Sequence, residues 1–219
     1  MTVRTADVDG VLVATIDDGK VNALSTEVID GLRAALALAS ERGQPLVVTG
    51  RDGYYSAGFD LAVIHGEDKA LASALLSDGG HLYREVVEAP VPVVASCTGH
   101  AIAGGALLLL CADYRIGRAG TYRLGFNEVT FGMALPSLVV AIATHRLESR
   151  YLTAATMFAR LASPEDAMAM GYLDEVVDDP LPRACEFAVS TAALPARAFA
   201  TTKRRVRGPL QEQLAAFDL

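Results

Sequence analysis

The sequence predicts one α/β domain with a helical C-terminal region. Strand-like and helix-like segments alternate irregularly through residues 1–120, and helix-like segments dominate after that. The chain has 219 residues, of which 52% are hydrophobic and 21% charged, so it is long enough to bury a sizeable core. It contains no tandem repeat, linker or low-complexity segment.

Charge and cysteine usage narrow the class of protein. A formal net charge of −7 argues against nucleic acid as the main partner, although a local basic patch would still accept an anionic small molecule. Cys97, Cys111 and Cys185 are odd in number and lack metal-ligand spacing, which predicts reduced thiols, no metal site and a cytoplasmic location. The N-terminus lacks a signal-like apolar run. The longest apolar run, Ala101–Ala112, is shorter than the about 20 residues that span a bilayer, so we expect no membrane partner.

The first half of the chain predicts two strands around a helix. Val11–Ile16 is β-rich, and Leu46–Thr49 is short and fully apolar, as in a buried strand. Between them Ser25 is a candidate N-cap, followed by apolar residues at helical spacing and an end near Gly43.

The next segment predicts a less regular region. Residues 64–76 are mixed in character, and we expect them to be mobile and to serve as a lid. Residues 81–87 predict a helix that ends before Pro90 and Pro92, and Val91–Ser96 predicts the following strand.

The second half predicts mainly helices. The clearest start signal is Ser163 as N-cap with Pro164 at the first helical position and Asp166 three residues after the cap, and Gly171 ends this helix. A short strand follows at residues 173–177. The other predicted helices cover residues 137–145, 149–158, 182–193 and 196–214.

Two glycine turns share one arrangement. Ala57-Gly58 and Ala103-Gly104-Gly105 each follow a strand and precede a helical run. Two backbone amides from such turns can converge on one oxygen as an oxyanion hole, typically worth about 3–4 kcal/mol per donor in the transition state. The alternative is that both are tight turns where glycine permits dense packing. Because the glycine spacing is not G-x-G-x-x-G, a dinucleotide site is unsupported.

Five motifs in order carry a family resemblance. Ser56–Leu61 resembles S-A-G-x-D-L, residues 98–106 resemble N-G-x-A-x-G-G-G, and Cys111–Ile116 resembles C-D-x-R-I-A. Residues 127–136 resemble P-E-x-x-x-G-x-x-P, and residues 161–177 resemble L-S-A-x-E-A…G-L-V-D-E-V-V. Together these motifs are similar to the crotonase family, the enoyl-CoA hydratase/isomerase superfamily, and especially to short bacterial members described as enoyl-CoA hydratases.

The resemblance implies a crotonase-like spiral of ββα units. Residues 1–195 would form this core, and residues 196–219 a C-terminal helix for oligomerisation and closure of the CoA pocket. It implies homotrimers that often pair into hexamers. It also implies an acyl-CoA ligand, with coenzyme A entering as part of the substrate and no separate cofactor.

The resemblance also implies the site residues. The oxyanion amides would belong to Ala57 and Gly104, with Glu128 as acid/base in an apolar pocket that raises its pKa. The residues that it implies for substrate and CoA binding are Ser56, Ala57, Gly58, Asp60, Leu61, His100, Gly104, Gly105, Leu107 and Lys203.

Other interpretations remain for several of these residues. Packing or hydrogen bonding suits His100 better than catalysis, and Asp60 and Asp113 suit turn and cap roles. Lys203 and its basic neighbours would meet CoA phosphates or form a solvated helix face.

Two departures from the family pattern stand out. The first glycine of the triplet is Ala103, which could shift the turn. Family hydratases carry two glutamates, and the position of the first is Leu107 here, whereas the second matches Glu128. Leucine cannot hold a water or move a proton.

Moving a double bond from C3 to C2 needs only one base. We therefore expect Δ3→Δ2 enoyl-CoA isomerisation, with hydration of a 2-enoyl-CoA as the main alternative. A non-catalytic CoA-binding or oligomeric family member is a further alternative.

Overall fold

A six-stranded sheet forms the centre of the molecule. The structure is a computed structural model that describes residues 2–216. Within that range the strand order is β1-β2-β4-β7-β9-β11, parallel throughout except for the antiparallel β1–β2 hairpin. The strands are β1 (Val3–Val8), β2 (Val11–Ile16), β4 (Leu46–Thr49), β7 (Val93–Cys97), β9 (Tyr114–Arg118) and β11 (Glu175–Val177). The predicted bounds of β2 and β4 are confirmed.

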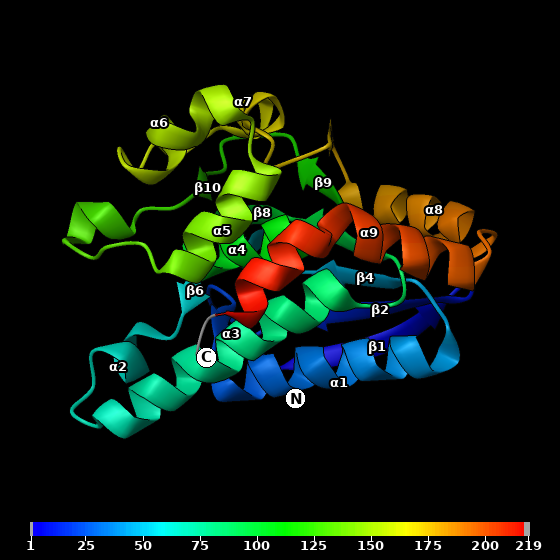
Figure 1. Cartoon of the computed structure of the whole chain (residues 1–219), viewed down its shortest axis with the longest axis horizontal. Helices are drawn as coiled ribbons and strands as arrows, with labels where there is room; N and C mark the ends of the chain where they lie inside the picture. Colours follow the sequence, from blue (N-terminus) through cyan, green and yellow to red (C-terminus); the bar gives the residue numbers. More distant parts are fainter. Residues whose placement is uncertain (1, 217–219) are drawn as a thin grey trace.

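The inner strands of the sheet are buried on both faces. Along β2, Leu12 and Ala14 face one core while Val11 and Val13 face the other, so the strand lacks the alternation of a half-exposed sheet. The second core is closed by α8 (Pro180–Ala192), whose Ala184 and Ala188 pack on that face. The larger core lies under α1 (Thr26–Arg42), α3 (Lys69–Glu88), α4 (Gly104–Cys111), α5 (Ser137–Arg146) and α9 (Ala196–Ala215) (Figure 1).

Short parallel strands leave this sheet and carry the two glycine turns. One small sheet has the order β10-β8-β5, from β5 (Gly53–Ser56), β8 (Gly99–Ile102) and β10 (Leu124–Gly125). A second joins β3 (Ala23–Leu24) to β6 (Gly58–Phe59). The alternation of strands and helices, with helices dominating the C-terminal half, fits the expected crotonase-like α/β architecture.

Predicted helix ends are confirmed at several caps. Ser25 accepts a hydrogen bond from the Val28 amide at 3.3 Å, and Gly43 closes α1 in the left-handed conformation. Ser163 likewise caps α7 (Pro164–Met170), and Gly171 ends it at φ 89°. The remaining helical pieces are α2 (Leu61–Ile64), η1 (Glu128–Phe131), η2 (Ser149–Tyr151) and α6 (Leu152–Thr156).

The expected mobile lid over residues 64–76 is wrong for most of its length. Helix α3 begins at Lys69, with Asp68 accepting from the Leu71 amide at 3.0 Å, and it runs to Glu88. Gly79 obscures the helical pattern, but a Cβ there would meet the Phe59 ring at 2.4 Å, so this glycine makes room for a packed aromatic. The four residues between α2 and α3 are the remaining connection.

Helix α9 is packed on the body of the molecule. It lies beside α3 and α5 in Figure 1, and Leu210 and Leu214 are buried. The last three residues of the expected C-terminal segment, 217–219, lie outside the described residues. Within residues 2–216, no helix combines the length and apolar character needed to cross a bilayer.

Candidate active site

The two glycine turns meet, as the sequence suggests. A Cβ placed on Gly58 would lie 3.0 Å from the Gly104 nitrogen and 3.1 Å from the Ala103 Cβ. A Cβ on Gly105 would lie 2.1 Å from the Ser56 carbonyl oxygen. Any larger residue at these positions would push the turns apart, so the glycines bring two amide-bearing turns to one point.

Gly104 is the first residue of α4. The first amides of a helix have no partner within the helix, and they carry the positive end of its dipole. The Tyr83 hydroxyl donates to the Gly104 carbonyl at 3.0 Å and so fixes this peptide from α3. The Gly104 amide is therefore placed to stabilise negative charge on a ligand oxygen.

The structure does not fit Ala57 as the second amide donor. The Ala57 N–H already donates to the Val21 carbonyl at 3.0 Å. The Gly58 N–H donates to Ser56 Oγ at 3.2 Å, and the Asp60 N–H donates to a carbonyl on β3 at 3.3 Å. Because the amides of Ala57, Gly58 and Asp60 each have an acceptor, the Phe59 amide is the remaining candidate for the second donor.

Phe59 also lies against the first turn of α4. Its ring atoms are 3.1 Å from the position of a Cβ on Gly104, and its ring packs edge-on to Tyr83 at 6.2 Å between centroids. The second turn is therefore still part of the candidate site, but the candidate amide is that of Phe59, two residues after the expected Ala57.

Ala103 keeps the turn in the form that a glycine would favour. Its backbone has φ 51° and ψ −123°, a conformation that costs a non-glycine residue about 1–3 kcal/mol. Its N–H donates to the Gly125 carbonyl at 2.9 Å, which anchors the turn to β10. The substitution is thus accommodated by strain rather than by a shifted turn.

Glu128 lies at the start of η1, directly after the segment that follows β10. The residue is half-buried, and its Oε2 atom has no hydrogen-bond partner among the described residues. Burial raises the pKa of the carboxyl, while its own and the Asn127 amide oppose that shift. This agrees with the expected apolar pocket.

Electrostatics connect Glu128 to the α4 turn. Burial is the main cause that raises the pKa of Tyr83, which contacts Gly104, and of Tyr172, and the negative charge of Glu128 adds to both shifts. Glu128 lies three residues after Gly125, whose carbonyl accepts from the Ala103 amide, so it follows directly on the segment that is anchored to the α4 turn.

Leu107 supplies no substitute for a second carboxylate. It follows Gly104 by one turn of α4, its amide donates to the Ala103 carbonyl at 3.0 Å, and it is 1% exposed. The position where family hydratases carry their first glutamate is thus an apolar core position.

An open cavity of about 580 Å³ adjoins the second turn. Its lining includes four of the candidate binding residues, Ala57, Gly58, Asp60 and Leu61. Sequence reasoning missed the opposite wall, which is formed by residues of the segment before α1, among them Asp18 and Lys20. Asp60 also caps α2, since it accepts from the Ala62 amide at 2.9 Å.

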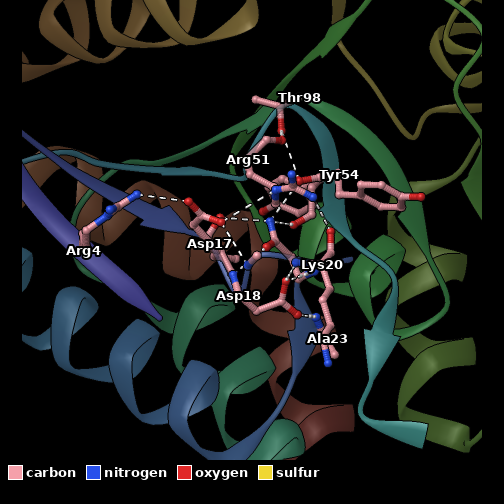
Figure 2. A network of polar contacts seen from close by, with 12 residues as sticks. Arg4, Asp17, Asp18, Lys20, Ala23, Arg51, Tyr54 and Thr98 are labelled. Carbon is pink, nitrogen blue, oxygen red and sulfur yellow. Dashed lines mark hydrogen bonds and ion pairs between the residues drawn. The ribbon is translucent and has the colours of Figure 1, made fainter. Parts of the chain in front are cut away.

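Figure 2 shows how that wall is braced. Asp17 joins Arg4 and Arg51, and Arg51 donates to the Lys20 carbonyl. Asp18 accepts from the amides of Lys20, Asn22 and Ala23 at 2.7–2.9 Å. These hydrogen bonds hold the Asp18–Ala23 segment in one shape beside the cavity. The sequence does not reveal this arrangement, because the capping of the Lys20, Asn22 and Ala23 amides by one side chain has no recognisable spacing.

The remaining candidates fall outside this junction. His100 lies between the rings of Tyr54 and Tyr122, and its Nδ1 accepts from the Arg123 amide at 3.1 Å; burial and Arg123 lower its pKa. This geometry supports the packing and hydrogen-bonding role expected for His100.

Lys203 does not fit either role expected of it. It is 6% exposed, and its ammonium lies 2.7 Å from Asp113 in the interior, so the structure offers it neither to CoA phosphates nor to solvent. Asp113 also pairs with Arg207 at 2.9 Å. Asp113 accepts from the Val93 amide at the start of β7, which is not a helix cap, and the aspartate is mainly the anion of a buried charge cluster.

Comparison with known proteins places this geometry in a family. The model of the enoyl-CoA hydratase/isomerase family matches residues 7–217. A solved enoyl-CoA hydratase/isomerase family protein from Pseudomonas syringae superposes with a TM-score of 0.94 at 37% identity, covering 98% of this chain and 94% of that one.

Curated relatives carry two activities in their names. Mouse mitochondrial enoyl-CoA delta isomerase 1 is 30% identical over 81% of this chain, which spans 63% of that protein's length. A probable enoyl-CoA hydratase from Mycobacterium avium is 28% identical over 94% of this chain and 83% of its own length. The match to the family model covers nearly the whole sequence and agrees with the crotonase-like fold, so the chain belongs to the enoyl-CoA hydratase/isomerase family.

Proposed function

We propose that this protein converts Δ3-enoyl-CoA to Δ2-enoyl-CoA with Glu128 as its single acid/base. The observation that carries this proposal is the composition of the site. One carboxylate with a raised pKa lies near the junction of the turns, and the position of a second is the buried Leu107. Such a site has the groups to form an enolate, but lacks the carboxylate pair that would hold and activate a water.

The reaction needs two amides and one base. The Gly104 and Phe59 amides donate to the thioester oxygen as negative charge builds on it. The Glu128 carboxylate takes a proton from C2, and the electron pair of that C–H bond is delocalised into a dienolate. The same carboxyl group then returns the proton to C4, which leaves the double bond between C2 and C3 and regenerates the carboxylate.

Burial of Glu128 suits this shuttle. A carboxyl group with a raised pKa binds the abstracted proton more tightly than an exposed one, and it then remains a competent acid for the return step. Leu107 helps by keeping water-binding groups away from the dienolate, which limits addition of water to the product.

The substrate site extends from the turns into the cavity of about 580 Å³. We place the CoA portion in this cavity, where Lys20 in the lining would bind its phosphates. The braced Asp18–Ala23 segment would form one wall. Assembly into homotrimers or hexamers and a cytoplasmic location remain part of the proposal, supported by the family membership alone.

Hydration is the second candidate, favoured by the relative from Mycobacterium avium that is named a probable hydratase. The first experiment follows exchange of the C2 protons of a saturated acyl-CoA in deuterium oxide. We expect exchange by the native protein and none by Glu128→Gln. Equal exchange by both proteins would exclude the assigned base, and no exchange by either would support a non-catalytic CoA-binding role.

A further inference from the structure

Tyr172 is a buried polar group that the proposed reaction does not use. It follows α7, it is 0% exposed, and its hydroxyl oxygen forms no hydrogen bond of good geometry within residues 2–216. The Phe126 amide lies near enough to the hydroxyl oxygen to lower its pKa, so that oxygen has a donor nearby while the hydroxyl proton has no acceptor. A free donor this deep in a protein is unusual and calls for a partner.

The packing around Tyr172 directs its hydroxyl towards the site. Its ring packs edge-on against Phe126 at 5.9 Å between centroids, and its hydroxyl would lie 3.5 Å from a Cβ on Gly125. Gly125 belongs to β10, which pairs with β8 just before the Ala103 turn. Phe126 is two residues before Glu128. The hydroxyl therefore lies beneath the stretch of chain that positions the proposed base.

The complementary atom is on Glu128. Its Oε2 is buried and also without a hydrogen-bond partner in the described part of the chain. Its charge adds to the burial that raises the pKa of Tyr83 on α3 and of Tyr172. The Tyr83 hydroxyl is already committed to the Gly104 carbonyl, so Tyr172 is the one with a proton to offer.

We propose that Tyr172 is a positioning residue for Glu128: its hydroxyl donates a hydrogen bond, through one bridging water, to the buried carboxylate oxygen. The bridge satisfies two buried polar atoms that otherwise lack partners, as internal waters commonly do. It also fixes the carboxylate orientation for transfer between C2 and C4. The pattern that residues 161–177 resemble has leucine at the position of Tyr172, so this donor is a feature of the present chain.

The inference rests on the proposed function only for its catalytic consequence. A hydrogen bond donated to the charged form of a carboxyl group lowers its pKa, so loss of the Tyr172 hydroxyl should raise the pKa of Glu128. That shift is measurable whether or not the protein is an isomerase.

The test compares the native protein with Tyr172→Phe by NMR titration of 13C-labelled glutamate carboxyls. The Glu128 signal is identified by its loss in Glu128→Gln. We expect Tyr172→Phe to raise the Glu128 pKa by about one unit and, in the same protein, to lower kcat for isomerisation about tenfold with little change in KM. The acid limb of the kcat/KM profile should move to higher pH by the same amount.

Tyr55→Phe is the matched control. Tyr55 is also buried, and burial, followed by Cys97 and Cys111, raises its pKa without a contribution from Glu128, so the control should leave the Glu128 titration in place. Tyr172→Phe removes one donor of the bridged hydrogen bond, so a thermal melt should show a folded protein with a slightly lower melting temperature. An unchanged Glu128 pKa in folded Tyr172→Phe overturns the inference, even if Glu128→Gln has shown that Glu128 is the base. Conversely, if Tyr172→Phe raises the Glu128 pKa but the native protein has no isomerase activity, the hydrogen bond is supported and the proposed function is rejected.

Discussion

At the scale of single residues, burial of the Glu128 carboxyl group lowers the free energy of unfolding while it favours the proposed proton transfer. Burial disfavours its charged form, so the folded protein holds the proton more tightly than the unfolded chain does. The folded state is therefore penalised as pH rises through the unfolded pKa, and the penalty is fully present at neutral pH. A neutral isostere at this position should remove it.

Glu128→Gln should accordingly lower the isomerisation rate about 10²–10⁴-fold while leaving the fold intact. Its melting temperature should equal or exceed that of the native protein at pH 7, and the difference should vanish at pH 4, where the native carboxyl is protonated. Steady-state kinetics and thermal melts at both pH values check this. A variant that is less stable at pH 7 than the native protein would show that the carboxylate has favourable contacts in the fold.

Ala103 is the second residue whose conformation has a measurable consequence. Its φ of 51° is one that glycine adopts without strain. Ala103→Gly should therefore stabilise the protein by about 1 kcal/mol, after the entropy that glycine adds to the unfolded chain is subtracted from the relieved strain.

The matched control for this change is Ala106→Gly. Ala106 lies in the interior of α4 with helical geometry, where glycine should cost about 1 kcal/mol. Urea denaturation of the two variants should give shifts of opposite sign. If both variants are destabilised alike, the Ala103 turn carries no strain.

At the scale of elements, the C-terminal helix is held by buried charge. Lys203 and Arg207 of α9 reach Asp113 after α4, and Arg207 also donates to the Cys111 and Ala112 carbonyls at 2.8 and 3.1 Å. Arg146 of α5 donates to the Leu110 and Ala112 carbonyls. Cations thus cover the negative end of the α4 dipole, whose other end carries the Gly104 amide.

Removal of the anion should loosen this attachment. Asp113→Asn leaves two buried cations with one fewer charge to pair with, and we expect it to cost about 3 kcal/mol. Arg204→Gln, an exposed change on the same helix, should stay within about 0.5 kcal/mol of the native protein. Urea midpoints measure both. Equal midpoints for the two variants would show that the cluster does not hold α9.

Because of Lys203, we expect the free energy of unfolding to increase with pH in the alkaline range. Burial lowers its pKa from 10.5 to about 8, although Asp113 pulls in the opposite direction. Between these values the unfolded chain binds the proton that the folded protein has released, so stability increases with pH across this window. Denaturation at pH 7.5–10 should show the increase in the native protein and a smaller slope in Lys203→Met. A native stability that falls between pH 8 and 10 would contradict this account.

The elements predicted best were those with a strong local signal. Strands β2 and β4 and the caps Ser25 and Ser163 follow from short-range chemistry, and all are as expected. Strand β1 was not predicted, because at the sheet edge five of its six residues are exposed and it shows no alternation. Helix α3 was misjudged since its glycines suggest a loop, whereas Gly79 accommodates the Phe59 ring.

The site was predictable in location but not in atomic detail. Motif order identified both turns and Glu128, and it identified the missing glutamate at Leu107. The choice between the Ala57 and Phe59 amides depends on which of them is used in hydrogen bonds to the neighbouring segment that includes β3. The three-dimensional pairing decides this, not the sequence. Tyr172 gave no signal either, because a tyrosine in an apolar stretch resembles any other core residue until its hydroxyl is found without a partner.

At the scale of the whole molecule, one scaffold positions the parts of the candidate site. The small strands bring the β6 turn and the α4 N-terminus together, η1 follows β10, and α9 is attached to the opposite end of α4. Relatives named for isomerisation and for hydration both match this chain. Our proposal therefore assigns the difference between the two activities to the local set of carboxylates rather than to the fold.

The measurement that tests this account most directly compares two reactions on one preparation of the native protein. Purified protein is given a 3-enoyl-CoA in one assay and the corresponding 2-enoyl-CoA in the other, and the rates of isomerisation and hydration are followed by product analysis. A single base and a buried Leu107 predict isomerisation with kcat/KM at least 10²-fold above that for hydration. Hydration as fast as isomerisation, with both lost in Glu128→Gln, would contradict the central claim that one carboxylate restricts this site to proton transfer.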